Sequence, residues 1–174
     1  ALQAGRTGGQ HLDVAGIAVA AQRRGVLEHL LFLAEADLRR DVRPRDRQRA
    51  RFATAAIGLD RSKLMLTNVV PWRPPGNRSP SGPEMEICRP FIERQIALAE
   101  PKVLLLLGNF TARFFFGGSG TIHTMRGQWR DVAVGPSIAP AIATLHPQEL
   151  LNAPASKSLA WNDLLAFQAR LRDL

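Results

Sequence analysis

The stretch that decides how this chain is interpreted runs from Thr67 to Arg78 and reads TNVVPWRPPGNR. The apolar run before it predicts a buried strand over Lys63–Val70, with Asn68 near its end. An amide at the carboxyl end of a strand in an α/β sheet lies where ligands bind, and it carries both donors and an acceptor. The alternative is an ordinary surface turn, because Pro, Gly and Asn are common in turns.

Composition limits the class of protein. The chain has 174 residues, 45% of them hydrophobic, which fits one globular domain. No apolar run approaches the roughly 18 residues of a membrane span, and no signal-like segment opens the chain, so we expect a cytoplasmic protein. The single cysteine, Cys88, excludes an intrachain disulfide. Neither a phosphate-binding glycine loop nor paired metal-ligand spacing occurs, so we expect no metal and no cofactor.

The charge favours a nucleic-acid partner. The formal net charge is +8, and it comes from 23 Lys and Arg residues against 15 Asp and Glu. A strongly basic domain is a candidate for binding phosphates. Most of the cations are Arg, and a GC-rich genome also produces this bias. The charge alone is therefore weak evidence for a nucleic-acid partner.

Residues 1–54 differ from the rest of the chain, because they are rich in Arg and contain no Lys. Their pattern predicts a short strand over Val14–Ala20, an amphipathic helix over Arg24–Arg40 and a solvated charge run over Arg39–Arg51. We therefore divide the chain into an atypical N-terminal segment, 1–54, and a domain, 55–174.

From residue 55 onward, apolar strands alternate with helices. Ser81 and Glu84 form a capping-box pattern that opens a helix. The expected elements after it are a helix over Pro83–Ala99, a strand over Lys102–Leu107, a helix over Phe110–Phe116 capped by Asn109, a polar loop over Ile122–Asp131, a strand over Ile138–Leu145 and a helix over Ala155–Arg172. This alternation predicts an α/β fold with a parallel sheet covered on both faces.

The apolar residues of the two long helices predict which face of each is buried. We expect the first long helix to bury Ile87, Phe91, Ile92 and Leu98, and the last helix to bury Leu159, Leu164, Phe167 and Leu171.

His146-Pro147 follows the third predicted strand, as Asn68 ends the first one. Parallel strands bring their carboxyl ends to one rim of a sheet, so the two side chains are expected to converge there. Taken singly, each has an ordinary alternative: His146 as a satisfied surface residue, and Asn68 as a strand-end cap.

Four blocks in order carry a resemblance to a known family: TNVVPWRPPGNR at 67–78, PKVLLLLG at 101–108, MRGQW at 125–129, and TLHP at 144–147 followed by NAPASK at 152–157. The chain resembles the uracil-DNA glycosylase superfamily, most closely its family 4 type, from about residue 55 to the end. The resemblance implies a three-layer α/β/α fold around a central parallel four-stranded sheet. Its first strand is degenerate here, or is replaced by Val14–Ala20.

The resemblance also implies an activity and a site. Such enzymes repair DNA by cutting the bond between a flipped-out uracil and its sugar. His146 matches the residue that donates to the uracil O2 as negative charge develops there, and Asn68 matches the residue that reads the base edge. The implied partner is uracil-containing DNA, bound by a monomer with no membrane partner. The DNA contacts that we expect are Arg73, Asn77, Arg78, Arg126, Leu151, Ser156 and Lys157.

Two departures from the family bear on activity. Many relatives hold a four-iron, four-sulfur cluster with four cysteines, but here only Cys88 stands at such a place and Trp72 occupies another, so we expect the cluster-free branch. The Gly-Glu-x-Pro-Gly motif that positions the attacking water is missing from residues 1–54. We therefore expect weak or no glycosylase activity. The alternatives are a non-catalytic DNA-binding relative, or a truncated or frame-shifted product.

Overall fold

The computed structural model describes residues 54–59, 64–72, 74–75 and 78–173, together with the backbone of residues 16–21. The helix expected over Arg24–Arg40 and the charge run over Arg39–Arg51 lie outside the described residues, as do Arg73 and Asn77. Within the described residues, no helix is long and apolar enough to cross a membrane.

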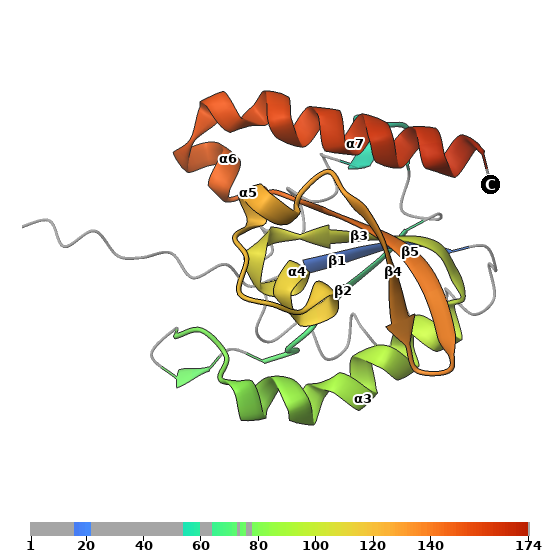
Figure 1. Cartoon of the computed structure of the whole chain (residues 1–174), viewed down its shortest axis with the longest axis vertical. Helices are drawn as coiled ribbons and strands as arrows, with labels where there is room; N and C mark the ends of the chain where they lie inside the picture. Colours follow the sequence, from blue (N-terminus) through green and yellow to red (C-terminus); the bar gives the residue numbers. More distant parts are fainter. Residues whose placement is uncertain (1–15, 22–53, 60–63, 73, 76–77, 174) are drawn as a thin grey trace, which may run out of the picture.

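Strands and helices are interspersed along the described chain, and the sheet lies between two long helices (Figure 1). The strands are β1 (Gly16–Ala21), β2 (Leu64–Asn68), β3 (Pro101–Leu107), β4 (Trp129–Val134) and β5 (Ser137–Thr144). The helices are α3 (Gly82–Ala99), α4 (Gly108–Phe116), α5 (Ile122–Met125), α6 (Glu149–Asn152), the 3-10 turn η3 (Pro154–Ser156) and α7 (Lys157–Arg172). The α/β class, with α3 on one face of the sheet and α7 on the other, is confirmed.

The sheet differs in detail from the expected four parallel strands. Within the described part of the chain it has five strands, in the order β2-β1-β3-β5-β4. β3 and β5 are parallel, whereas β1 runs antiparallel to both β2 and β3, and β4 runs antiparallel to β5. The short apolar segment expected over Val14–Ala20 does form a central strand, but in the reverse direction. Both directions satisfy the backbone hydrogen bonds of a strand, so its sequence does not specify which one is adopted.

The core has two parts because both faces of β3 are covered. Leu104 and Leu106 join a cluster with Cys88 and Ile92 of α3. The alternate residues of the strand, including Leu105, join a second cluster with residues of α7. Side chains of a strand alternate between faces, so a continuous run of leucines is what a doubly covered strand requires.

The capping box predicted for α3 is present: the Ser81 backbone N–H donates to the Glu84 carboxylate at 2.7 Å. The predicted inner face of α3 is partly wrong. Ile92 is buried, but Ile87, Phe91 and Leu98 are 62%, 67% and 41% exposed. The helix carries two apolar stripes, and the buried one consists of Cys88, Ile92, Ile96 and Ala99. These residues recur every three or four positions, which is the spacing of one helix face.

Three further expectations need correction. The segment Ile122–Asp131, expected to be a polar loop, contains α5 and the first residues of β4. Further along β4, Val132 and Val134 are buried in the core. Asn109 lies inside α4 instead of capping it, because the helix begins at Gly108 and Leu107 holds the cap position. Leu159 is 38% exposed, whereas Leu164 and Phe167 are buried as predicted.

Candidate active site

The sheet register aligns the ends of the strands along one rim. Asn68 pairs with Gly16, Gly16 pairs with Leu107, and Leu107 pairs with Thr144. Because β1 is antiparallel to both neighbours, β2 and β3 point the same way, and β5 is parallel to β3. The carboxyl ends of β2, β3 and β5 therefore share a rim. With adjacent strands about 4.8 Å apart, roughly 14 Å separates the ends of β2 and β5.

His146 follows the end of β5 at this rim and is only 5% exposed. Its ring Nδ1 accepts the backbone N–H of Gln148 at 3.2 Å. Its own backbone N–H donates to Glu149 Oε2 at 3.3 Å, and its carbonyl accepts the Glu149 N–H at 2.9 Å. An acceptor Nδ1 carries no proton, so the neutral ring carries its proton on Nε2. The turn thus makes Nε2 the ring nitrogen that carries a proton.

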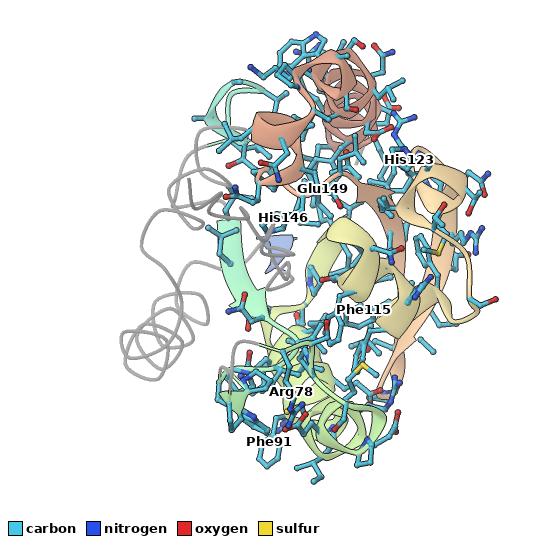
Figure 2. All side chains as sticks on the ribbon, turned by 90° about the vertical axis from the view of Figure 1, so that its left-hand side faces the viewer. Arg78, Phe91, Phe115, His123, His146 and Glu149 are labelled. Atoms are coloured by element: carbon cyan, nitrogen blue, oxygen red, sulfur yellow. The ribbon has the colours of Figure 1, made fainter. Side chains whose placement is uncertain are left out.

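Figure 2 shows His146 and Glu149 next to each other at this end of the molecule, with Arg78 and Phe91 at the far end of the view. Glu149 begins α6, and its carboxylate turns back toward the backbone of His146. A backbone N–H bonded to the carboxylate offsets part of its negative charge, which weakens the repulsion that Glu149 would exert on a DNA phosphate.

Gly108 makes room for the histidine. It has φ +84°, and a Cβ on it would lie 3.1 Å from His146 Cβ. The glycine at the junction of β3 and α4 is therefore required twice, once by its backbone conformation and once by the approach of the histidine.

We expect Gly108→Ala to destabilise the protein by more than the roughly 1–2 kcal/mol that a positive φ alone costs an alanine. The matched control is Gly118→Ala, because Gly118 has φ +79° and a Cβ on it would meet nothing within 4 Å. Chemical denaturation of both variants measures the difference. Equal losses would show that the His146 approach adds nothing.

Asn68 is the last residue of β2 and is partly exposed at the rim. The preceding Thr67 is buried, and its hydroxyl bonds to Gln95 Oε1 of α3 at 2.8 Å. This bond attaches the end of β2 to α3. Successive side chains of a strand point to opposite faces, so Asn68 points to the face away from α3.

The segment after His146 presents the other expected contacts. Leu151 of α6 is 51% exposed, Ser156 ends η3 and is partly buried, and Lys157 is exposed at the start of α7. An exposed leucine and a cation thus lie on one short segment beside the rim, which is the combination suited to unstacking bases and contacting a phosphate.

Arg78 is held by the first turn of α3. Its two terminal nitrogens each donate to the Glu84 carboxylate at 2.8 Å, and it is about half exposed. The Arg78 guanidinium, with help from Ser81, lowers the pKa of Glu84 to about 2. The pair fastens the loop that follows Asn68 to α3, and it leaves the Arg78 charge partly compensated.

Glu84→Gln tests that attachment by its pH dependence. A carboxyl group whose pKa is depressed in the folded state stabilises the protein above its unfolded pKa, and the contribution is lost as the pH falls through the folded value. We therefore expect Glu84→Gln to be less stable than the parent chain at pH 6, with the gap closing between about pH 4.5 and pH 2. Urea denaturation at several pH values measures the gap, and a gap independent of pH would contradict the assignment.

Arg126 occupies a different environment from the one expected of a phosphate contact. Its Nε and Nη2 donate to the two carboxylate oxygens of Asp163 at 3.0 and 2.7 Å, and Nη2 also donates to the Leu159 carbonyl. The Thr144 hydroxyl donates to Asp163 Oδ2 at 2.7 Å. Burial raises the pKa of the Asp163 carboxyl, while Thr144 and Arg126 oppose that shift.

Asp163, Thr144 and Gly108 were not expected at the site from the sequence. A signal for Asp163 was present, since it lies within the apolar stripe formed by Ala160, Leu164 and Phe167 on α7. A carboxylate on a buried helix face requires a partner, and this one finds Arg126.

The strand β1 brings no ionisable residue to the rim, because its six residues read GIAVAA and Gly16 is the one beside Asn68. The cysteine content does not fit a four-cysteine iron–sulfur cluster either. The one cysteine, Cys88, is 1% exposed within the core cluster, and burial raises the pKa of its thiol. Among the described residues, no group of three His, Cys, Asp or Glu side chains is arranged to hold a metal.

An amide and a histidine at the carboxyl rim of an α/β sheet lie where proteins of this class bind their ligands. The model of the uracil DNA glycosylase superfamily matches residues 5–165, and this chain belongs to that superfamily. The match includes most of residues 1–54, and the division of the chain at residue 54 stays a prediction.

Relatives from archaea and bacteria support the assignment. The chain is 34% identical over 102 residues to the type-4 uracil-DNA glycosylase of Sulfurisphaera tokodaii, covering 52% of this chain and 46% of the relative. It is 36% identical over 104 residues to that of Archaeoglobus fulgidus, covering 58% and 52%. For the enzyme of Thermotoga maritima the identity is 36% over 95 residues, covering 54% and 48%. The chain thus spans about half the length of the curated relatives that it matches.

Proposed function

We propose that this chain is a DNA base-excision repair protein of the uracil-DNA glycosylase type, and that the rim between Asn68 and His146 takes up a flipped-out uracil. The observation that carries the proposal is the geometry of His146. The buried imidazole accepts the Gln148 N–H at Nδ1, which leaves the ring proton on Nε2 as a donor at the carboxyl rim of the sheet.

The proposed reaction breaks the bond between N1 of uracil and C1′ of its sugar. The electron pair leaves with the base, so negative charge builds on the uracil O2 and positive charge on the sugar. The His146 Nε2–H donates a hydrogen bond to that O2 and stabilises the charge, while water adds to C1′. The added water loses its proton to solvent, and the departing uracil anion takes up a proton from solvent. The products are free uracil and an abasic site in the DNA.

Asn68 is proposed to select the base. Its amide nitrogen donates to the uracil O4, and its amide oxygen accepts the uracil N3–H. Cytosine presents the reverse pattern at these two positions, so it would leave buried polar groups unpaired at about 1–3 kcal/mol each. The exposed Leu151, with Ser156 and Lys157, is proposed to contact the DNA beside the flipped base. Arg78 is proposed to contact a phosphate further along the DNA, because Glu84 compensates only part of its charge.

A second function, DNA binding without base removal, is favoured by one observation. The described residues of β1 supply no carboxylate to the rim, where a group that positions water would be useful. We therefore expect the release of uracil to be slow.

The test is a uracil-release assay on single-stranded DNA with one uracil, at enzyme excess, together with DNA binding at two salt concentrations. The glycosylase proposal expects slow release that increases when a Gly-Glu-x-Pro-Gly segment is introduced before β2. Salt-dependent binding with no release, in both proteins, would establish the non-catalytic function instead.

A further inference from the structure

The side chains of Arg126, Thr144 and Asp163 form a hydrogen-bonded network next to the end of β5. None of them takes part in the proposed chemistry. Asp163, on α7, is 2% exposed, and both of its carboxylate oxygens are used. Oδ1 accepts from Arg126 Nη2 at 2.7 Å, while Oδ2 accepts from Arg126 Nε at 3.0 Å and from the Thr144 hydroxyl at 2.7 Å. One carboxylate of α7 is therefore bonded to the last residue of β5 and to the residue that follows α5.

The network is attached to both ends of the segment 145–158, which carries His146 and Lys157. Thr144 is the last residue of β5, just before Leu145 and His146. Asp163 lies on α7, which Lys157 begins, and Arg126 also donates to the Leu159 carbonyl in the first turns of that helix. The segment 145–158 carries the histidine at one end and the lysine at the other, and both ends are attached to this network.

The connection between α5 and β4 makes the arrangement rigid. The Gly127 N–H donates to the Ala143 carbonyl at 3.0 Å, which ties this connection to β5. Gly127 has φ +72°, and a Cβ on it would lie 3.0 Å from Asp163 Oδ1. The carboxylate is thus enclosed by backbone as well as by its bonding partners, and little room is left for it to move.

Stability alone does not explain a buried ion pair at this place. Removing two charges from water is costly, and apolar residues of similar size often stabilise a core as well or better. What a bidentate arginine–carboxylate pair adds is a fixed geometry, because two parallel bonds define both distance and orientation.

We propose that Asp163, acting through Thr144 and Arg126, is a positioning residue that sets the geometry of the His146 turn and of the segment leading to Lys157. The inference rests on the proposed function of His146 and deepens it, since the Thr144 hydroxyl is the bond of the network nearest to the histidine.

The test removes that one bond with a matched pair of variants. Thr144→Val keeps the shape of the side chain and loses the hydroxyl, Thr144→Ser keeps the hydroxyl, and Thr144→Ala is a second removal if the valine methyl is not tolerated. The main readouts need no turnover: the nitrogen chemical shifts of the His146 imidazole, which report its tautomer, and the hydrogen-exchange rate of the Gln148 amide.

We expect Thr144→Val to shift the imidazole signals toward a mixture of tautomers and to raise the exchange rate of the Gln148 amide about tenfold, as the loss of one charge-assisted bond allows. Thr144→Ser should restore both. Uracil release, where it is measurable, should fall with Thr144→Val and recover with Thr144→Ser.

A purely structural role gives a different result. Thr144→Val would then lower the melting temperature while the His146 signals and the Gln148 exchange stay as in the parent chain, and the inference would be wrong. Failure of the proposed function is separable: if no variant releases uracil but the His146 signals still respond to the Thr144 hydroxyl, the positioning inference holds and the glycosylase proposal fails.

Discussion

Replacing Arg126 with methionine is expected to lower the free energy of unfolding by about 3–5 kcal/mol at neutral pH, the usual cost of removing one partner of a buried ion pair. In the parent chain Asp163 is 2% exposed, and the variant removes its cation and leaves the Thr144 hydroxyl as its remaining side-chain partner among the described residues. For a chain of this size, such a loss lowers the melting temperature by roughly 10 °C. Thermal unfolding followed by circular dichroism measures it.

The pH dependence of the same variant identifies the cause. Burial already raises the pKa of the Asp163 carboxyl, and removing the cation raises it further. Between the unfolded and folded pKa values the native state then binds more protons than the unfolded state, so the free energy of unfolding falls as the pH rises. The deficit of Arg126→Met should therefore be largest near pH 7 and shrink as the pH falls toward 4.

Arg78→Met is the matched control, because Arg78 also makes a bidentate pair with a carboxylate, at 2.8 Å to each oxygen. Its side chain is 49% exposed, against 16% for Arg126, so water screens the pair and we expect a clearly smaller loss. Equal losses in the two variants, or a deficit of Arg126→Met that does not change with pH, would contradict the assignment of a buried charge.

His146→Ala is expected to slow uracil release by about 100- to 1000-fold, which is the usual effect of removing one donor from a developing oxyanion. The variant loses the Nε2 donor and leaves the Gln148 N–H without its Nδ1 acceptor. Because the donor acts on charge that appears only in the transition state, the binding of uracil-containing DNA should change little while the rate of release falls. Single-turnover release and fluorescence-anisotropy binding measure the two effects separately.

His123→Ala is the control for that experiment, since His123 is an exposed histidine on α5 that Figure 2 shows on the same side of the molecule. It should release uracil at a rate within about twofold of the parent chain. If His146→Ala and His123→Ala behave alike, His146 does not supply the donor and the proposed mechanism fails.

Much of the fold could be predicted from the sequence. The strands β2, β3 and β5 and the helices α3 and α7 were expected within two residues of where they lie. Their patterns are local: an apolar run bounded by Pro or Gly for each strand, and Ser81 with Glu84 for the start of α3. The shared rim of Asn68 and His146 also followed, because β2, β3 and β5 run in one direction.

The candidate site could be predicted only in part. The expectation of a histidine and an amide at the rim came from their places at strand ends, but the partner of Arg126 could not be foreseen. Asp163 is 37 residues away along the chain, and no local pattern pairs the two. Nothing in the sequence distinguished Arg126 from the other cations, whereas in the folded chain it is paired with the Asp163 carboxylate.

Pattern alone also left choices that packing made. Helix α3 has two apolar stripes, and only the position of the sheet selects the stripe with Cys88 and Ile92 over the one with Ile87 and Phe91. The segment Gly16–Ala21 is apolar enough for a central strand in either direction, and it is antiparallel in the assembled sheet.

The sequence by itself therefore determined the α/β class, the order of β2, α3, β3, α4, β5 and α7, and the strand ends near which Asn68 and His146 lie, because these depend on contacts between residues close along the chain. The tertiary structure decided which helix face is buried, how β1 runs, and that Asp163 binds Arg126 and Thr144. Those outcomes depend on the free energy of burying particular groups together, and that energy exists only once distant segments have been brought into contact.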